Sequence, residues 1–243
     1  VKNLFVDSNK NLWILLSNGL VRLSEKEIIE DNIEINISHE KYSFTGAICQ
    51  YGTTILIGTE NEPVSFTLFG RSIDSKNIIP SISENLHHIT YLQTIPDNTA
   101  AFIATFDGHA YLHSAINNNL TEIKFHGYGK QKVDKVYTDQ YHQLWITTEK
   151  PGVTRFNIAN SESKYYQLTP EYLAPTIDLE RPVFFEDGNK NLWIGTHGGG
   201  LVRYNRMEDK FEEFRNNAND DYSIPSNIVH CIAQDPSGQL WVV

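Results

Sequence analysis

The residues best suited to hold a small ligand lie in long irregular stretches between apolar segments. These stretches cover residues 38–46, 76–88, 169–181 and 216–227, and loops on a rigid scaffold often carry binding residues. Aromatic rings and the planar guanidinium group suit the faces and hydroxyl groups of sugars. Ordinary loop packing and contact with a second domain are the alternatives. The predicted ligand-binding residues are Tyr42, Tyr172, Arg181, His197 and Tyr222.

Metal and acid–base chemistry have weaker support in the sequence. Metal sites need several ligands that converge at defined spacing. His87 and His88 are adjacent, so on a strand their side chains point to opposite faces. No acidic partner stands at a definable position for His197 or His230. We therefore expect core or surface histidines, no catalytic residue, no metal ligand and no cofactor.

Two runs, Asp7–Asn11 and Asp187–Asn191, resemble the start of a calcium-binding loop because Asp and Asn alternate with other residues. Such a loop needs a bidentate Glu at its twelfth position. Asn18 and Gly198 occupy that position here. The runs therefore predict turns and not calcium sites.

The same runs belong to a repeat in which Asp precedes Trp by six residues. The four copies are Asp7 with Trp13, Asp139 with Trp145, Asp187 with Trp193, and Asp235 with Trp241. Two degenerate copies, at residues 55–59 and 101–105, lack both the Asp and the Trp. The steps between successive copies are 43 to 48 residues. A period in the forties built from short alternating strands is typical of propeller blades.

The repeat predicts an all-β fold, a β-propeller built of four-stranded antiparallel blades. About five and a half blades are present, and we expect them to be part of a seven-bladed propeller. We treat residues 1–243 as one partial β-propeller whose chain is cut inside blades at both ends. The blade anchors lie near Trp13, Leu56, Phe102, Trp145, Trp193 and Trp241.

Each recurring residue has a predicted structural role. Neighbouring blades must cover the apolar faces of each blade, and the Trp supplies contact area between them. Gly195 is expected to let a neighbouring blade approach closely. The Asp can accept hydrogen bonds from backbone amides two residues on. Gly238, or the Asn-Lys pairs at 9–10 and 189–190, then takes the left-handed position of the turn. Function is expected where the repeats differ.

Composition and charge narrow the function classes. Hydrophobic residues make up 40% of the 243 residues, which is a globular composition. The formal net charge of -10 repels phosphate backbones, so nucleic acid is not an expected partner. No apolar run approaches the roughly 18 residues needed to span a bilayer. Cys49 and Cys231 are expected to be small buried hydrophobes, with a disulfide as the alternative.

The motif Asp-x-x-Gly/Lys-x-Leu-Trp, followed by Gly-Leu/Val-x-Arg, resembles the two-component regulator propeller repeat. Ser223–Asn227, followed by Ile228, Asp235 and Trp241, is similar to that family's inter-blade linker and next blade. The resemblance covers essentially the whole chain. It is weakest in the second and third repeats, which lack the Asp and the Trp.

The resemblance implies a non-catalytic sensor module that lies in the periplasm and belongs to a hybrid two-component system with a histidine kinase. It implies a response to oligosaccharides. An adjacent propeller and an Ig-like domain of the same chain are the implied partners, with a homodimer as a further one. Contact with the membrane is expected only through parts of the chain outside this sequence.

Two other function classes remain open. Streptogramin lyases have similar propeller repeats, and a lyase would need a catalytic histidine, for which His197 or His230 could serve. A protein-interaction scaffold would suit the acidic surface, although the repeat lacks the Gly-His and Trp-Asp signature of intracellular propellers. A membrane helix and a kinase beyond Val243 would decide for the sensor.

Overall fold

The computed structural model describes most of the chain. The described residues are 1–16, 20–24, 27–33, 43–60, 64–69, 72–75, 86, 88–96, 98–117, 119–124, 132–148, 152–168 and 178–243. Only the backbone is described for residues 20, 24, 27–33, 64–69, 72–75 and 178–181.

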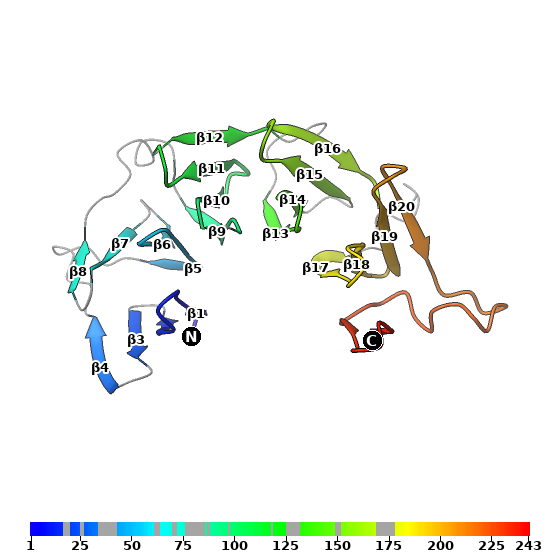
Figure 1. The fold of residues 1–243 in the computed structure, drawn as a ribbon, viewed down its shortest axis with the longest axis horizontal. Coiled ribbons are helices and arrows are strands. Elements are labelled where there is room, and N and C mark those ends of the chain that lie inside the picture. The colour runs from blue at the N-terminus through cyan, green and yellow to red at the C-terminus, as the bar shows by residue number, and fades with distance from the viewer. Residues whose placement is uncertain are drawn as a thin grey trace. The chain divides into compact units, whose positions relative to one another are not determined.

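The regular structure of the described residues consists of antiparallel sheets in which each strand pairs with the next one along the chain (Figure 1). The chain divides into two compact units, Val1–Ile123 and Lys124–Val243. The first unit holds three four-stranded sheets, and the second holds two four-stranded sheets and one two-stranded sheet. The predicted four-stranded antiparallel blade is therefore confirmed.

The strand bounds of the first unit follow the repeat. The first blade contains β1 (Asn3–Val6), β2 (Leu12–Leu15), β3 (Leu20–Ser24) and β4 (Glu27–Ile33). The second contains β5 (Phe44–Tyr51), β6 (Thr54–Thr59), β7 (Val64–Phe69) and β8 (Ser72–Ser75). The third contains β9 (Ile89–Thr94), β10 (Ala100–Thr105), β11 (Ala110–Ser114) and β12 (Leu120–Ile123).

The second unit continues the same order. The fourth blade contains β13 (Val133–Thr138), β14 (Gln143–Thr148), β15 (Val153–Asn157) and β16 (Glu162–Tyr166). The fifth contains β17 (Asp178–Glu186), β18 (Leu192–His197), β19 (Leu201–Asn205) and β20 (Lys210–Phe214). The two-stranded sheet pairs β21 (Ile232–Gln234) with β22 (Leu240–Val242).

The repeated Asp binds both its own turn and the Trp. In the first blade, Asp7 Oδ1 accepts the backbone N–H groups of Asn9 and Asn11 at 2.8 and 2.9 Å, which confirms the predicted turn bonds. Asp7 Oδ2 accepts the indole N–H of Trp13 at 2.8 Å. The same indole bond recurs for Asp139 with Trp145 at 2.9 Å, Asp187 with Trp193 at 2.8 Å and Asp235 with Trp241 at 3.1 Å. The carboxylate oxygens of these runs thus serve the turn.

The turn closes on a residue in the left-handed region, as predicted. Lys10, Lys190 and Gly238 have φ values of 64°, 68° and 89°. His142 takes this position in the fourth blade, with a φ of 57°. Because glycine adopts this conformation with the least strain, the hydrogen bonds to the Asp three residues earlier must hold the other three residues in place.

The predicted close approach at the strand glycines is also confirmed. A Cβ atom on Gly195 would lie 2.5 Å from Cγ1 of Val229, which leads into β21 of the next sheet. A Cβ atom on Gly58 would lie 2.8 Å from the carbonyl oxygen of Ile89 in the third blade. Any side chain at these positions would push the neighbouring sheet away.

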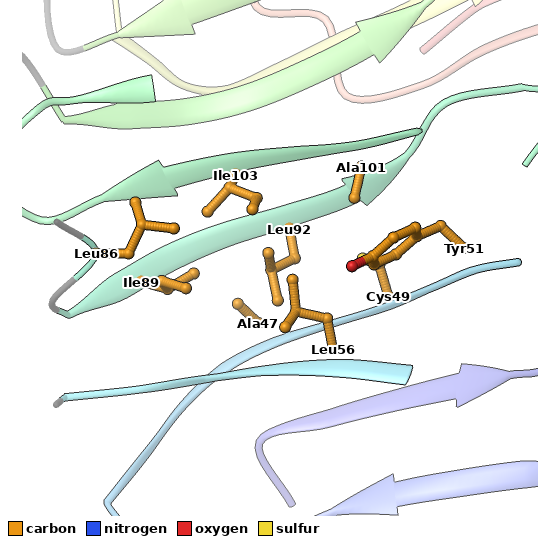
Figure 2. Packing of buried hydrophobic residues seen from close by; sticks show 9 residues of the cluster. All are labelled: Ala47, Cys49, Tyr51, Leu56, Leu86, Ile89, Leu92, Ala101 and Ile103. Atoms are coloured by element: carbon orange, nitrogen blue, oxygen red, sulfur yellow. The ribbon is translucent and has the colours of Figure 1, made fainter. Parts of the chain in front are cut away.

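Buried side chains lie between neighbouring sheets. Figure 2 shows the cluster between the second and third blades, formed by Ala47, Cys49, Tyr51, Leu56, Leu86, Ile89, Leu92, Ala101 and Ile103. Between the fourth and fifth blades, the Trp145 ring meets the Tyr204 ring edge-on at 4.7 Å between centroids. The predicted role of Trp as an inter-blade contact is therefore confirmed for this copy.

The two cysteines differ in environment, and both thiols are free. Cys49 is buried as predicted, and burial raises the pKa of its thiol to about 12. The same prediction is wrong for Cys231, which is exposed. Side chains alternate along an extended segment, and here the neighbouring Ile232 takes the buried side.

A second repeated hydrogen bond ties three of the Asp turns to the next blade. The residue after the Asp donates its backbone N–H to a side chain at the end of the next blade's first strand. Ser8 donates to Gln50 Oε1 at 2.8 Å, Gln140 to Glu186 Oε2 at 3.1 Å, and Gly188 to Gln234 Oε1 at 2.7 Å. Within each unit, neighbouring blades are thus joined by polar contacts as well as by apolar packing.

Asp209 adds an ionic contact between the fourth and fifth blades. Its carboxylate accepts hydrogen bonds from Arg155 at 2.8 Å, and from Lys164, Tyr166 and Tyr204. Desolvation alone would raise the pKa of Asp209, but these donors outweigh it and hold the pKa well below its ordinary value. Three of the four donors come from the fourth blade, so Asp209 fastens its own blade to the preceding one.

The Asp–indole bond can be tested with Asp187→Asn. We expect the free energy of unfolding to fall by about 2 kcal/mol, because the amide cannot accept from both the turn and the buried indole. Asp235→Asn is the matched control and should cost less, since Trp241 is 56% exposed and water can replace its partner. Equal losses for the two variants in urea titrations would contradict the interpretation.

The same substitution should change how stability depends on pH. Burial raises the pKa of Asp187, but hydrogen bonds from Trp193, Asn191 and Asn189 outweigh it and leave the pKa lowered. A carboxyl group with a lowered folded-state pKa stabilises fully above its unfolded value of about 3.9 and loses that contribution as pH falls. Melting temperatures measured from pH 7 to pH 3 should therefore fall less steeply for Asp187→Asn than for the parent chain.

The close approach at Gly195 can be tested by adding one methyl group. Gly195→Ala should lower the free energy of unfolding by about 1–3 kcal/mol, because Val229 must move. Gly188→Ala is the control, since its nearest neighbour at 3.2 Å is the flexible Gln234 amide oxygen. Denaturant titrations that give the same loss for both variants would disprove close approach as the reason for glycine.

Candidate functional site

The predicted site residue His197 ends strand β18 and begins a glycine-rich turn into β19. Thr196 holds this turn, because its backbone N–H and its hydroxyl both donate to the carbonyl oxygen of Gly200, at 3.0 and 2.9 Å. Gly200 has a φ of 80°, and a Cβ atom there would lie 2.5 Å from the carbonyl oxygen of Phe214. The turn that follows His197 is therefore fixed in position.

The segment before β21 packs on this turn and brings a second histidine to it. The carbonyl oxygen of Asn227 accepts the N–H groups of Gly198 and Gly200 at 2.9 and 2.8 Å. Val229 donates to the carbonyl oxygen of Thr196 at 2.9 Å. As a result, the rings of His197 and His230 lie 5.6 Å apart between centroids, with their planes at 60°. One imidazole at the end of β18 and one in the segment before β21 thus lie side by side.

Arg215 lies at the same turn. Its Nε donates to the carbonyl oxygen of Gly199 at 3.2 Å, and its Nε lies 3.6 Å from Glu213 Oε2. Its Nη2 is buried and has no hydrogen-bond partner among the described residues. A buried donor without a partner is costly to the folded state. We name His197, His230 and Arg215 the histidine-pair site.

Of the five predicted residues, the side chains of His197 and Tyr222 are described, and His197 lies in this site. Tyr222 lies in the connection before β21, but its side chain is 100% exposed and stands in solvent. Tyr42 and Tyr172 lie outside the described residues. Arg181 lies in β17, and only its backbone is described. The predictions for these three side chains stay predictions.

Phe106 is a candidate that sequence reasoning missed. It occupies the position in the third blade that His197 occupies in the fifth, four residues after the anchor position of its repeat. The sequence contains a signal for it, because this position differs between blades. It is Glu60 in the second blade, and it is a residue with a ring in the third and fifth blades. Neither Phe106 nor His230 was predicted to bind a ligand.

A polar hollow of about 520 Å³ lies at the outer strands of the fourth blade. It is lined by Arg155, Asn157, Ser161, Glu162, Ser163 and Lys164. Its two cations already bind Asp209 of the fifth blade. Their first role is therefore to join blades, and the hollow is a weaker candidate than the histidine-pair site.

The polar groups of the histidine-pair site can form hydrogen bonds with a ligand. Imidazole nitrogens donate or accept, and a guanidinium N–H donates, which suits hydroxyl or carboxylate oxygens. No group of three or more His, Cys, Asp or Glu side chains in the described ranges could hold a metal ion.

The described part of the chain also contains no helix with the length and apolar character needed to cross a membrane.

Comparison with known proteins agrees with the sequence resemblance. Residues 223–243 match the model of a family described as the two component regulator propeller. No curated protein matches this chain. The extracellular domain of BT4673 from B. thetaiotaomicron, assigned to the hybrid two component systems, is a similar structure with a TM-score of 0.64 and 17% sequence identity. The match covers 100% of this chain and 31% of that one, so the chain spans about a third of its length.

Two further structures share the fold. A catalytically inactive H270A virginiamycin B lyase from Staphylococcus aureus, with quinupristin, has a TM-score of 0.58 and 13% identity, and the match covers 99% of this chain and 76% of that one. YCF48 bound to D1 peptide has a TM-score of 0.61 and 13% identity, with 99% and 74% covered. At these identities the likeness is one of fold. The predicted resemblance is confirmed, and the chain is a β-propeller with a repeat of the two component regulator propeller family at residues 223–243.

Proposed function

We propose that this chain is a non-catalytic, extracytoplasmic sensor module of a two-component signalling protein, and that it responds to oligosaccharides. The observation that carries the proposal is the family match at residues 223–243. The fold likeness to the extracellular domain of BT4673, over 99% or more of this chain, supports it. In this proposal the module lies in the periplasm, beside a further propeller and an Ig-like domain of the same protein, and a homodimer transmits the signal.

The histidine-pair site supports ligand capture on this module. Its residues stand on a turn and a connecting segment, where scaffold proteins commonly place recognition groups. The backbone bonds from Asn227 and Val229 fix the turn before any ligand arrives, so binding would cost little ordering entropy. The two imidazoles offer hydrogen-bond donors or acceptors to a ligand oxygen.

Calorimetric titration of neutral and acidic oligosaccharides tests the proposal. We expect at least one glycan to bind the parent chain, and His197→Asn to weaken it about tenfold, the loss of one good hydrogen bond. His142→Asn is the matched control, because His142 is an exposed histidine of a different turn. No heat with any glycan, or equal affinity for the parent and His197→Asn, would contradict ligand capture at this site.

A lyase is the second candidate, favoured by the fold likeness to virginiamycin B lyase and by the proximity of His197 and His230. An H270A change leaves that protein catalytically inactive. Incubating this chain with quinupristin and following it by liquid chromatography separates the two functions. We expect quinupristin to remain unchanged. Conversion that disappears in His197→Ala or His230→Ala would replace the sensor proposal with an enzyme.

A further inference from the structure

A second ring-bearing turn lies in the first unit, between β10 and β11. The side chain of Phe106 is 59% exposed there. Its ring lies on the imidazole of His88, with 4.6 Å between centroids and 14° between planes. The backbone N–H of Phe106 donates to the carbonyl oxygen of His88 at 2.8 Å. We name this arrangement the Phe106 platform: one aromatic face rests on a histidine, and much of the phenyl ring is open to solvent.

The platform is fixed before any ligand arrives. Thr105 donates to the carbonyl oxygen of His109 at 3.0 Å, and Gly108 donates to that of Thr105 at 3.1 Å. The Thr105 hydroxyl binds Asp107. His88 is held at a φ of 52°, a left-handed conformation that is unusual for a residue other than glycine. A rigid exposed ring loses little entropy on binding, which is the property of an aromatic anchor.

The charges around the platform select among ligands. His109 lies between two carboxylates, 3.1 Å from Glu122 Oε1 and 3.6 Å from Asp107 Oδ2. With one imidazole between two carboxylates, the local charge is negative whether or not His109 is protonated. The net charge of the chain, -10, has the same sign. An anionic ligand is therefore repelled here, whereas hydroxyl groups find carboxylate acceptors.

We propose that Phe106 stacks against the apolar face of a sugar ring without anionic substituents, whose hydroxyl groups donate to the carboxylate of Asp107. This rests on the proposed oligosaccharide-sensing function and names the class of glycan: neutral, and neither a uronic acid nor a sulfated sugar. The stacking face is the side of the phenyl ring that His88 leaves open. Phe106 occupies the same position in its repeat as His197 does. In this proposal the turns that carry the two residues therefore serve recognition at equivalent places in their blades.

Calorimetry with the 243-residue chain tests this inference. The neutral probes are tetrasaccharides of glucose, mannose, xylose and N-acetylglucosamine, and the acidic probe is tetragalacturonate. We expect a neutral probe to bind more tightly than tetragalacturonate. Phe106→Ala should weaken it about five- to tenfold, the worth of one aromatic contact, and Phe106→Trp should retain it. Ile116→Ala is the control, because Ile116 is an 82% exposed apolar side chain of another turn in the same unit. Thermal unfolding verifies that each variant is folded.

The outcomes separate this inference from the proposed function. Asp107→Asn tests the carboxylate: weaker binding of the neutral probe supports the inference. A glycan that binds the parent and Phe106→Ala equally but loses affinity in His197→Asn would leave the sensor proposal standing and overturn the Phe106 platform. Tighter binding of tetragalacturonate than of every neutral probe would also overturn it. If none of the probes binds the parent chain, both proposals fail.

Discussion

The hydrogen bond from the Trp indole to the Asp six residues earlier is the contact on which the first, fourth and fifth blades depend. One carboxylate closes the turn between the first two strands with one oxygen and satisfies the indole with the other, as Asp187 does for Trp193. Without it, the indole N–H would lie buried and unpaired, and the largest side chain of the blade could not enter the space between sheets. This bond explains the spacing of six residues. The turn must reverse the direction of the chain before the Trp, on the second strand, can face the carboxylate.

Stability within each unit is shared between neighbouring blades. Gln50 and Gln234 each reach from one blade to the turn amide of the blade before it, beside the Asp that orders that turn. The glycine at 195 lets the next sheet close on the apolar face. Repeat proteins in which each unit contacts only its neighbours gain stability from such interface contributions. The turns at the ends of strands can therefore vary in sequence, as His197 and Phe106 do, while the interfaces stay intact.

The sequence was sufficient to predict the structural roles of residues that recur in several repeats. It was insufficient to predict the contacts of residues that occur once. The Asp, the Trp, the strand glycine and the left-handed turn residue appear in several copies, so their roles could be inferred from spacing. The proximity of His197 and His230 depends on Val229 pairing with Thr196 across a long connection, which no local pattern encodes. The stack of Phe106 on His88 depends on the backbone hydrogen bond from Phe106 N–H to the carbonyl oxygen of His88, which the repeat does not encode. Cys231 was misjudged because its neighbour Ile232 takes the buried side.

The second and third blades, which lack the Asp and the Trp, are joined by a ring contact and a turn hydrogen bond. The Tyr51 ring meets the His113 ring edge-on at 5.4 Å, and Gly52 donates to the carbonyl oxygen of Asn98 at 3.1 Å. A chain of near-identical blades can assemble in the wrong order, since each face fits several others. Contacts made by side chains that differ from the repeat would favour pairing of these two blades with each other. The loss of the Asp and the Trp from the second and third repeats would then help the blades to assemble in the correct order during folding.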